Sequence, residues 1–247
     1  MDADKNGALS FGAAAERYDR FRPRYPAPAL AWALGPDAAG PRDVVDLAAG
    51  TGILTRGLLA AGHRVTPVEP DAAMRAQLAA ATPGVTALAG SAEAIPLPSS
   101  SVDAVVAGQA YHWFDAPLAH AEAARVLRPG GYFAAVWNMR DKRVPWVAAL
   151  DAIASAADRD HPPPASFGPS FSPVEHREFA HSTTLTADDL VTMMTTRSYY
   201  LTATEDARKR FEAAVRELAG THPDLAGRDS FELPYRTVVY RASTLRS

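Results

Sequence analysis

The chain has 247 residues, a length that predicts one large domain or two small ones. Hydrophobic residues make up 47% of it and charged residues 21%, as in globular proteins, which excludes a wholly disordered chain. The formal net charge of -3 excludes the strong basic excess that is typical of nucleic-acid-binding proteins. The absence of cysteine excludes disulfide frameworks, thiolate zinc sites and cysteine nucleophiles.

The first residues of the chain, Met1 to Asn6, are polar and acidic, and they lack the basic and apolar regions of a secretory signal. No apolar run approaches the roughly 18–20 residues that a bilayer-spanning helix needs. We therefore expect a soluble, cytoplasmic protein with no membrane partner and no nucleic-acid partner. The sequence leaves the oligomeric state open.

Strands and helices are predicted to alternate between residues 42 and 140. Apolar runs bounded by turn residues predict five strands, at residues 44–47, 65–69, 85–89, 102–108 and 132–137. Helical spacing predicts three helices. The first begins at Ile53 and stops at Gly62, and the second is capped by Asp71. The third covers residues 118–127 and is ended by the segment from Arg128 to Gly131. This alternation predicts a parallel sheet with helices on both faces and right-handed crossovers.

Further elements are predicted after residue 174. They are a strand over residues 178–184, helices over residues 187–196 and 205–218, and a last strand over residues 231–241. We therefore expect a doubly wound, Rossmann-like α/β fold. Its sheet would have seven strands, mostly parallel, with an antiparallel last strand.

The length exceeds what one nucleotide-binding sheet needs, and the excess lies where a cap over the strand ends would be built. We therefore predict a single domain over residues 1–247. Its parts are an N-terminal cap (1–40), a core (41–140), a lid or insert (141–173), and C-terminal strands and helices (174–247).

The turn over residues 46–52 is the first functional signal. A strand that enters a glycine-rich turn and then a helix lets the backbone approach a nucleotide closely, and free N–H groups at the helix start favour an anionic group. Glu69, about 20 residues later at the end of the second strand, is placed to accept hydrogen bonds from both ribose hydroxyls. A tight structural turn and a solvated carboxylate are the alternative interpretations.

These two signals fit two cofactors. A dinucleotide site has a third glycine, where this chain has Thr55, and Asp46 would repel a pyrophosphate. The same acid can accept a bond, directly or through water, from a cationic α-amino group. The turn therefore favours S-adenosylmethionine over NAD.

The motifs together resemble the class I S-adenosylmethionine-dependent methyltransferases, of the small-molecule type and similar to the trans-aconitate methyltransferase group. The resemblance covers roughly residues 10–140. It rests on the pattern Asp46-x-Ala48-x-Gly50-x-Gly52, on Glu69, on Gly90-Ser91-Ala92-Glu93 and on Val126-Leu127-Arg128-Pro129-Gly130-Gly131.

The resemblance implies a set of cofactor-binding residues. Arg22 would meet the cofactor carboxylate, Glu69 the ribose, and Ser91 the adenine amino group. The full set is Tyr18, Arg22, Asp46, Ala48, Gly50, Gly52, Glu69, Pro70, Met74, Ser91, Ala92 and Gln109. Two positions depart from the family, which usually has glycine in place of Ala48 and often aspartate in place of Ser91. Met74 has an alternative interpretation as a core residue.

The segment over residues 109–115 follows the fourth strand, whose end faces the transferred methyl group in related enzymes. It lacks the Asn/Asp-Pro-Pro-Tyr segment of enzymes that methylate bases or protein amides, and its aromatic residues can surround a sulfonium cation. His112 is the candidate catalytic base, because an unperturbed imidazole has a pKa near 6.5; it could instead only shape the pocket. The candidate substrate-binding residues are Tyr25, Tyr111, Trp113, Trp137, Asn138 and Tyr199.

The implied function is methyl transfer to a small molecule by in-line displacement. The alternatives are an NAD(P)-dependent oxidoreductase, a non-catalytic protein that binds S-adenosylmethionine, and a methyltransferase that acts on a macromolecule. The seven histidines are scattered without the spacing of metal ligands, so we predict no metal site.

Overall fold

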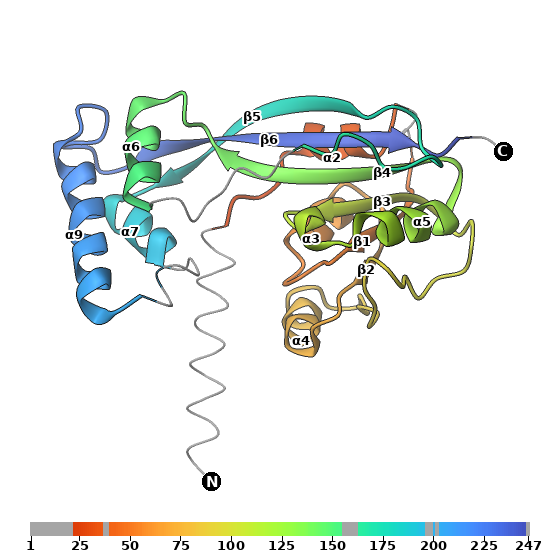
Figure 1. Cartoon of the computed structure of the whole chain (residues 1–247). Coiled ribbons are helices and arrows are strands. Elements are labelled where there is room, and N and C mark those ends of the chain that lie inside the picture. Colours follow the sequence, from red (N-terminus) through yellow and green to blue (C-terminus); the bar gives the residue numbers. More distant parts are fainter. Residues whose placement is uncertain (1–21, 37–39, 155–162, 196–199, 201–202, 246–247) are drawn as a thin grey trace, which may run out of the picture. The chain divides into compact units, whose positions relative to one another are not determined.

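The computed structural model describes residues 22–36, 40–154, 163–195, 200 and 203–245 (Figure 1). The chain divides into two compact units. The first, here called the sheet unit, comprises residues 24–139, 161–179 and 237–247. The second, here called the helical unit, comprises residues 1–23, 140–160 and 180–236. The segment expected to form a lid, 141–173, is thus divided between both units, and the single domain stays a prediction.

The strands form one six-stranded sheet in the order β2-β1-β3-β4-β6-β5, one strand fewer than predicted. Parallel pairing joins β1 to β2, β1 to β3 and β3 to β4. The strand bounds are β1 Asp43–Leu47, β2 Arg64–Val68, β3 Val102–Gly108, β4 Leu127–Arg140, β5 Glu175–Leu185 and β6 Phe231–Ser243.

The last strand runs antiparallel to both of its neighbours, as predicted. Along β4 and β6, backbone hydrogen bonds join Gly131 to Thr244 and Asp141 to Pro234, so one strand ascends while the other descends. Side-chain bonds show the same for β5 and β6, because Arg241 bonds to Glu175 whereas Glu232 bonds to Ser182. The sheet is therefore mixed, with a parallel part from β2 to β4.

The strand predicted over residues 85–89 does not form, and this accounts for the missing strand. A single parallel bridge joins Leu88 to Val68, through Leu88 N–H to the Pro67 carbonyl and Glu69 N–H to the Leu88 carbonyl. The next bridge along the ladder would need a donor from the backbone nitrogen of Pro67, which proline lacks. β2 therefore lies at the edge of the sheet.

The strand β4 begins at Leu127, where the sequence pattern predicts a helix end and a chain break. Leu127 pairs with Val102, and a register shift between Val102 and Ala104 precedes the regular ladder that starts with Tyr132. A side chain at Gly131 would place its Cβ 2.9 Å from the Asp103 carbonyl oxygen. The glycines thus permit a close approach of two strands instead of breaking the chain.

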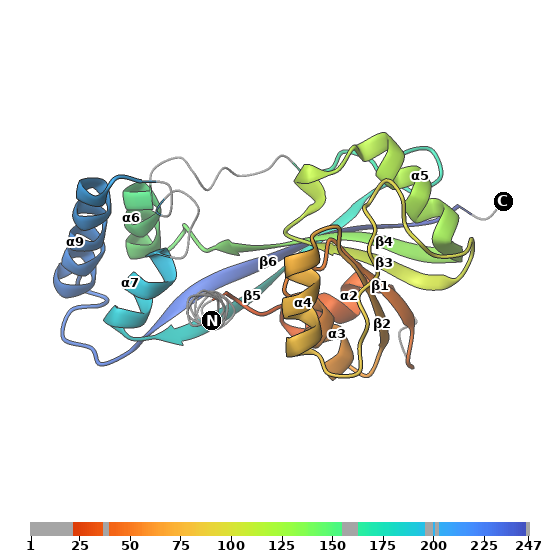
Figure 2. The same cartoon turned by 90° about the horizontal axis from the view of Figure 1, so that it is seen from below.

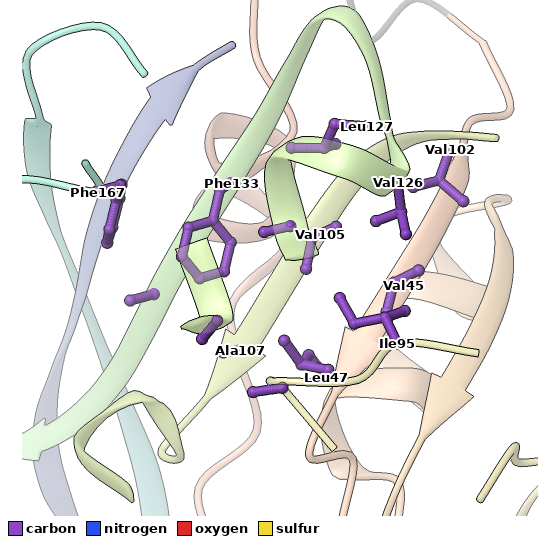
Figure 3. Close-up of a cluster of buried hydrophobic side chains, with 14 of the residues drawn as sticks. Val45, Leu47, Ile95, Val102, Val105, Ala107, Val126, Leu127, Phe133 and Phe167 are labelled. Atoms are coloured by element: carbon purple, nitrogen blue, oxygen red, sulfur yellow. The ribbon is translucent and has the colours of Figure 1, made fainter. Parts of the chain in front are cut away.

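Helices cover both faces of the sheet unit, as predicted (Figure 2). Successive strand residues point to opposite faces, so Val45 and Phe133 pack with α5 whereas Val44 and Ala134 pack with α2 and α3. Figure 3 shows the first of these clusters. The helix bounds are α2 Ala27–Ala33, α3 Ile53–Ala60, α4 Ala72–Ala81 and α5 Ala116–Val126, with a 3₁₀ turn η1 at Tyr111–Trp113.

The segment around Phe167 belongs to the core of the sheet unit. Phe167 is fully buried, and its ring centroid lies 4.7 Å from that of Phe133 on β4 (Figure 3). Phe171 is buried beside both rings. This part of the expected lid therefore stabilises the face of the sheet that α5 covers.

The helical unit has a core of its own. Its helices within the described residues are α6 Pro145–Ala154, α7 Ala187–Thr195 and α9 Glu205–Thr221, and the last two confirm the sequence prediction. α9 packs against both α6 and α7 (Figure 1). Leu150, Leu190, Met194, Val215 and Leu233 are fully buried among them. Among the described helices, none combines the length and the apolar character that crossing a membrane requires.

A buried arginine joins four elements of the sheet unit. The guanidinium of Arg241 on β6 lies 3.9 Å from the ring centroid of Trp32 on α2 and 5.2 Å from that of Tyr132 on β4. It also donates to the Trp32 carbonyl and to the Glu175 carboxylate on β5. Only 8% of Arg241 is exposed, so these contacts replace most of its water.

Replacing Arg241 with alanine should lower the free energy of unfolding by roughly 2–3 kcal/mol, because a stacking contact and several hydrogen bonds disappear together. Urea denaturation followed by circular dichroism would measure this. The matched control is Arg216→Ala, since the Arg216–Asp188 pair is exposed and should contribute less than about 1 kcal/mol. Equal effects of the two substitutions would contradict the role of Arg241.

Candidate active site

The predicted functional segments meet at the carboxyl ends of the parallel strands. Leu47 and Val68, the last residues of β1 and β2, pair in register, as do Gly108 of β3 and Val136 of β4. The glycine-rich turn, Glu69, Gln109 and Asn138 follow these positions directly. In sheets of this kind ligands bind at this edge.

The turn after β1 has three residues in the left-handed backbone region. Ala48 and Gly50 both have φ of 55°, and Gly52, which caps α3, has φ of 82°. A Cβ at Gly50 would meet nothing within 4 Å, so this glycine faces open space. Ala48 holds a conformation that glycine adopts without strain and that costs alanine about 1–2 kcal/mol. The turn therefore holds a fixed backbone shape with open space at Gly50, and it is called the cradle below.

Glu69 is buried at the end of β2, with only 6% of its surface exposed. One carboxylate oxygen accepts from the Gly50 N–H at 2.9 Å, and the other accepts from the Asp71 N–H at 2.9 Å. Each oxygen retains a further lone pair. The carboxylate thus links the turn after β1 to the start of α4 and can still accept two hydroxyl groups.

Asp46 is fully buried below the turn, and burial raises the pKa of its carboxyl from 3.8 to about 7. The Thr55 hydroxyl donates to it at 2.6 Å and opposes this rise, whereas the charge of Glu69 adds to it. The strand residues beside it, Pro67 and Val106, are neutral. Thr55 thus supports the acid that the sequence predicts to receive an amino group.

The raised pKa of Asp46 predicts pH-dependent binding of a cationic ligand. A cation favours the ionised carboxylate. Below pH 7, binding therefore requires Asp46 to lose a proton, and the affinity decreases as the pH is lowered. Affinity for S-adenosylhomocysteine should be roughly 10-fold lower at pH 6 than at pH 8. Calorimetry across this range would measure it. Asp46→Asn should remove the dependence, and a dependence that persists in this variant would assign it to another group.

The segment that follows Leu88 forms a tight turn in which Ser91 and Ala94 pair with each other. Ala92 is buried there and Ser91 is half-buried. Asp71 caps α4 by accepting from the Met74 N–H at 2.8 Å, as predicted. Met74 is 41% exposed, which excludes the alternative interpretation as a core residue. Pro70 is also exposed.

The segment after β3 places Gln109 and His112 at the strand ends. Gln109 has φ of 58°, a strained value for a residue with a side chain, and its amide donates to the Asn138 carbonyl at 2.9 Å. His112 is half-buried in η1, and its ring centroid lies 4.8 Å from that of Trp113. Trp113 is 80% exposed. A large exposed aromatic side chain is thus available beside the candidate base.

Two predicted substrate-binding residues, Tyr111 and Trp137, pack in the core instead of lying open. The Tyr111 hydroxyl hydrogen bonds to the His120 Nε2 at 3.0 Å, and its ring packs on Phe167. Trp137 is 7% exposed, with its ring edge-on to that of Tyr111. Burial lowers the pKa of His120 and raises the pKa of Tyr111, so both are neutral near pH 7. These contacts hold η1 against the sheet.

Tyr25 and Asn138 lie at the end of β3 and β4. The Tyr25 hydroxyl would be 2.7 Å from a Cβ at Gly108, so a side chain at this position would displace Tyr25. The Asn138 side chain donates to the Arg24 carbonyl at 3.4 Å and accepts from the Thr237 hydroxyl at 2.5 Å.

Three other predicted residues are not placed at this edge. Tyr18 and Tyr199 lie outside the described residues. Arg22 is half-buried and belongs to the helical unit.

The sequence analysis did not identify the residues whose side chains support the loops and side chains of the candidate site. Besides Thr55, these are Glu93, which accepts from the Asp115 N–H at 3.0 Å, and the pair Glu122 and Arg125 on α5. Glu93 belongs to the motif Gly90-Ser91-Ala92-Glu93, and its charge could have indicated a supporting role. Glu122 and Arg125 lie on an ordinary amphipathic helix, whose sequence pattern gives no such indication. In the described part of the chain, no group of three metal-ligating side chains forms a site.

The sequence is similar to proteins of one enzyme family. A family model described as a methyltransferase domain matches residues 45–135, from β1 into β4. An uncharacterized methyltransferase of Mycobacterium tuberculosis is 43% identical over 239 residues, which cover 96% of each chain. The chain belongs to the S-adenosylmethionine-dependent methyltransferase family. The NAD(P)-dependent alternative is thereby excluded.

Two further likenesses extend over nearly the whole methyltransferase. An uncharacterized methyltransferase-like protein of Schizosaccharomyces pombe is 32% identical over 232 residues, or 90% of this chain and 91% of the other. A solved structure of a type II methyltransferase candidate from Anaeromyxobacter dehalogenans has a TM-score of 0.64 and 26% identity, with 92% of this chain and 99% of that chain covered. These likenesses show the family and do not reach the narrower trans-aconitate group.

Proposed function

We propose that this methyltransferase binds S-adenosylmethionine at the carboxyl ends of β1, β2 and β3 and transfers its methyl group to a small-molecule acceptor. The observation that carries this proposal is the buried Glu69 carboxylate, which is bonded to the backbone of the turn after β1 and retains free lone pairs. A buried carboxylate with unused acceptors is stabilised by polar donors, and a ribose diol supplies two.

The residues around the turn fit the parts of this cofactor. Gly50 faces open space where a side chain would stand, which suits the methionine part and the ribose. The Asp46 carboxylate suits a cationic amino group, reached directly or through water. Ser91 and Ala92 offer a hydroxyl and a backbone for the adenine, with Met74 and Pro70 exposed to pack beside it. Gly52 opens the helix that follows the turn.

Methyl transfer from S-adenosylmethionine requires little acid catalysis from the protein. S-adenosylmethionine supplies a methyl group on a sulfonium whose leaving group is already activated. The carbon–sulfur bond breaks as the bond to the acceptor forms, so the protein's tasks are alignment and exclusion of water. Where the acceptor atom carries a proton, as a hydroxyl, carbon acid or ammonium does, the His112 imidazole is the candidate to take it.

Support for a small acceptor comes from what surrounds the strand ends. The segment over residues 109–115 is aromatic and lacks the motif of base and amide methylation, and the net charge is mildly negative. We propose that Tyr25, Trp113 and Asn138 contact the acceptor.

Calorimetric titration of the purified chain tests the proposal. S-adenosylhomocysteine should bind with a one-to-one stoichiometry, whereas NAD should show no binding under the same conditions. A screen of small acceptors with S-adenosylmethionine should then detect S-adenosylhomocysteine release. Failure of S-adenosylhomocysteine to bind would overturn the proposal. Binding without turnover on any acceptor would instead favour the non-catalytic alternative.

A further inference from the structure

Two loops of the proposed site are joined by one carboxylate, that of Glu93. The first loop, Ser91 to Ala94, lies on the proposed adenine side, and the second, residues 109–115, carries His112. We infer that Glu93 is a positioning residue that transmits cofactor binding on the first loop to the second. This inference rests on the proposed function, because it assumes that the adenine binds beside Ser91 and Ala92.

The contacts of Glu93 reach both loops. Its carboxylate accepts from the Asp115 N–H at 3.0 Å, at the point where η1 gives way to α5. Its backbone belongs to the first loop, where it stands between the paired residues Ser91 and Ala94. One side chain thus joins the proposed adenine loop to the second loop.

The charge of Glu93 strengthens its contact with Asp115. Burial alone would raise the pKa of the Glu93 carboxyl, but the nearby Ser91 hydroxyl and the Asp115 amide hold this pKa below its ordinary value. The group is therefore ionised near neutral pH, and hydrogen bonds to an ionised acceptor are roughly twice as strong as neutral ones.

The other end of the first loop is fixed separately. Glu122 on α5 accepts from the Ile95 N–H at 2.9 Å, and Arg125 donates to the carbonyls of Ile95 and Leu97 at 2.8 Å each. These bonds hold the chain after Ala94 to the body of α5. These bonds do not reach residues 109–115. A shift of the first loop would therefore be transmitted to the second loop through the side chain of Glu93.

Hydrogen exchange resolved at single amides tests this inference on the full chain. Saturating S-adenosylhomocysteine should slow exchange of the Ala92 and Asp115 amides by roughly 10-fold in the wild type. In Glu93→Ala the ligand should still slow exchange at Ala92, but the ratio at Asp115 with and without ligand should approach one. The Gly50 amide, bonded to Glu69, reports that the site is occupied in each variant.

Two further variants separate transmission from a merely structural effect. Glu122→Ala removes a comparable bond to the same loop and should keep the ligand-dependent protection of Asp115. Glu93→Gln retains one carbonyl oxygen for the Asp115 N–H and should restore much of that protection. Two outcomes would overturn this inference and leave the proposed function standing. One is ligand-dependent protection of Asp115 that is unchanged in Glu93→Ala. The other is a wild type in which the ligand protects Ala92 but not Asp115. Absence of any ligand effect at Gly50 and Ala92 would instead overturn the proposed function beneath it.

Discussion

Replacing Glu69 with alanine should lower the affinity for S-adenosylhomocysteine by about 100-fold or more. The carboxylate is proposed to accept both ribose hydroxyls, and hydrogen bonds to a charged group contribute roughly 1.5–3 kcal/mol each, against about 1.4 kcal/mol per factor of ten in affinity. The loss also frees the Gly50 and Asp71 amides that Glu69 holds, so the cradle becomes less ordered. Isothermal titration calorimetry measures the change directly.

Two comparisons keep this prediction interpretable. Glu69→Gln retains one carbonyl oxygen and should bind with intermediate affinity, which separates the lost ribose contact from a collapsed turn. Glu217→Ala, on the exposed surface of α9, should leave affinity unchanged. Thermal denaturation verifies that each variant is folded. Wild-type affinity in a folded Glu69→Ala protein would show that the ribose is bound elsewhere.

Replacing His112 with alanine should slow methyl transfer by on the order of 10²–10⁴-fold, the range that a positioned general base supplies. Affinity for S-adenosylhomocysteine should be preserved, because the turn after β1 and Glu69, and not His112, are proposed to hold the cofactor. The measurement is the rate of S-adenosylhomocysteine release with an acceptor found by screening, under single-turnover conditions.

The control for His112 is His176→Ala, an exposed histidine on β5 that should leave the rate unchanged. A base that takes the acceptor proton also predicts that the rate of the wild type falls as the imidazole becomes protonated, and that this dependence disappears in His112→Ala. An unchanged rate in that variant would assign His112 a role in shaping η1 beside Trp113 only.

The sequence predicted the local geometry of the candidate site where that geometry depends on neighbours in the chain. The turn from Asp46 to Gly52 and the cap at Asp71 are local, because their hydrogen bonds and backbone angles involve residues only a few positions apart. The register of parallel strands then brings Glu69 beside Gly50 without any further information. The roles of these residues toward the cofactor stay predictions.

The predictions that were wrong all depended on distant partners. Residues 85–89 have the pattern of a strand, yet a missing donor at Pro67 limits them to one bridge. Leu127 has the pattern of a helix end, yet pairing with Val102 places it in β4. Local pattern cannot report what the facing strand offers, and in these two places that decided the structure.

By itself, the sequence determined the alternation of strands and helices, the antiparallel last strand, the cradle after β1 and the family. These follow from hydrophobic period and from turn residues, which act over a few positions. Only the tertiary structure decided that the sheet has six strands, that Tyr111 and Trp137 pack in the core beside Phe167, and that Glu93 joins two loops. The physical reason is that burial and hydrogen bonding between residues far apart in the chain are set by which surfaces meet.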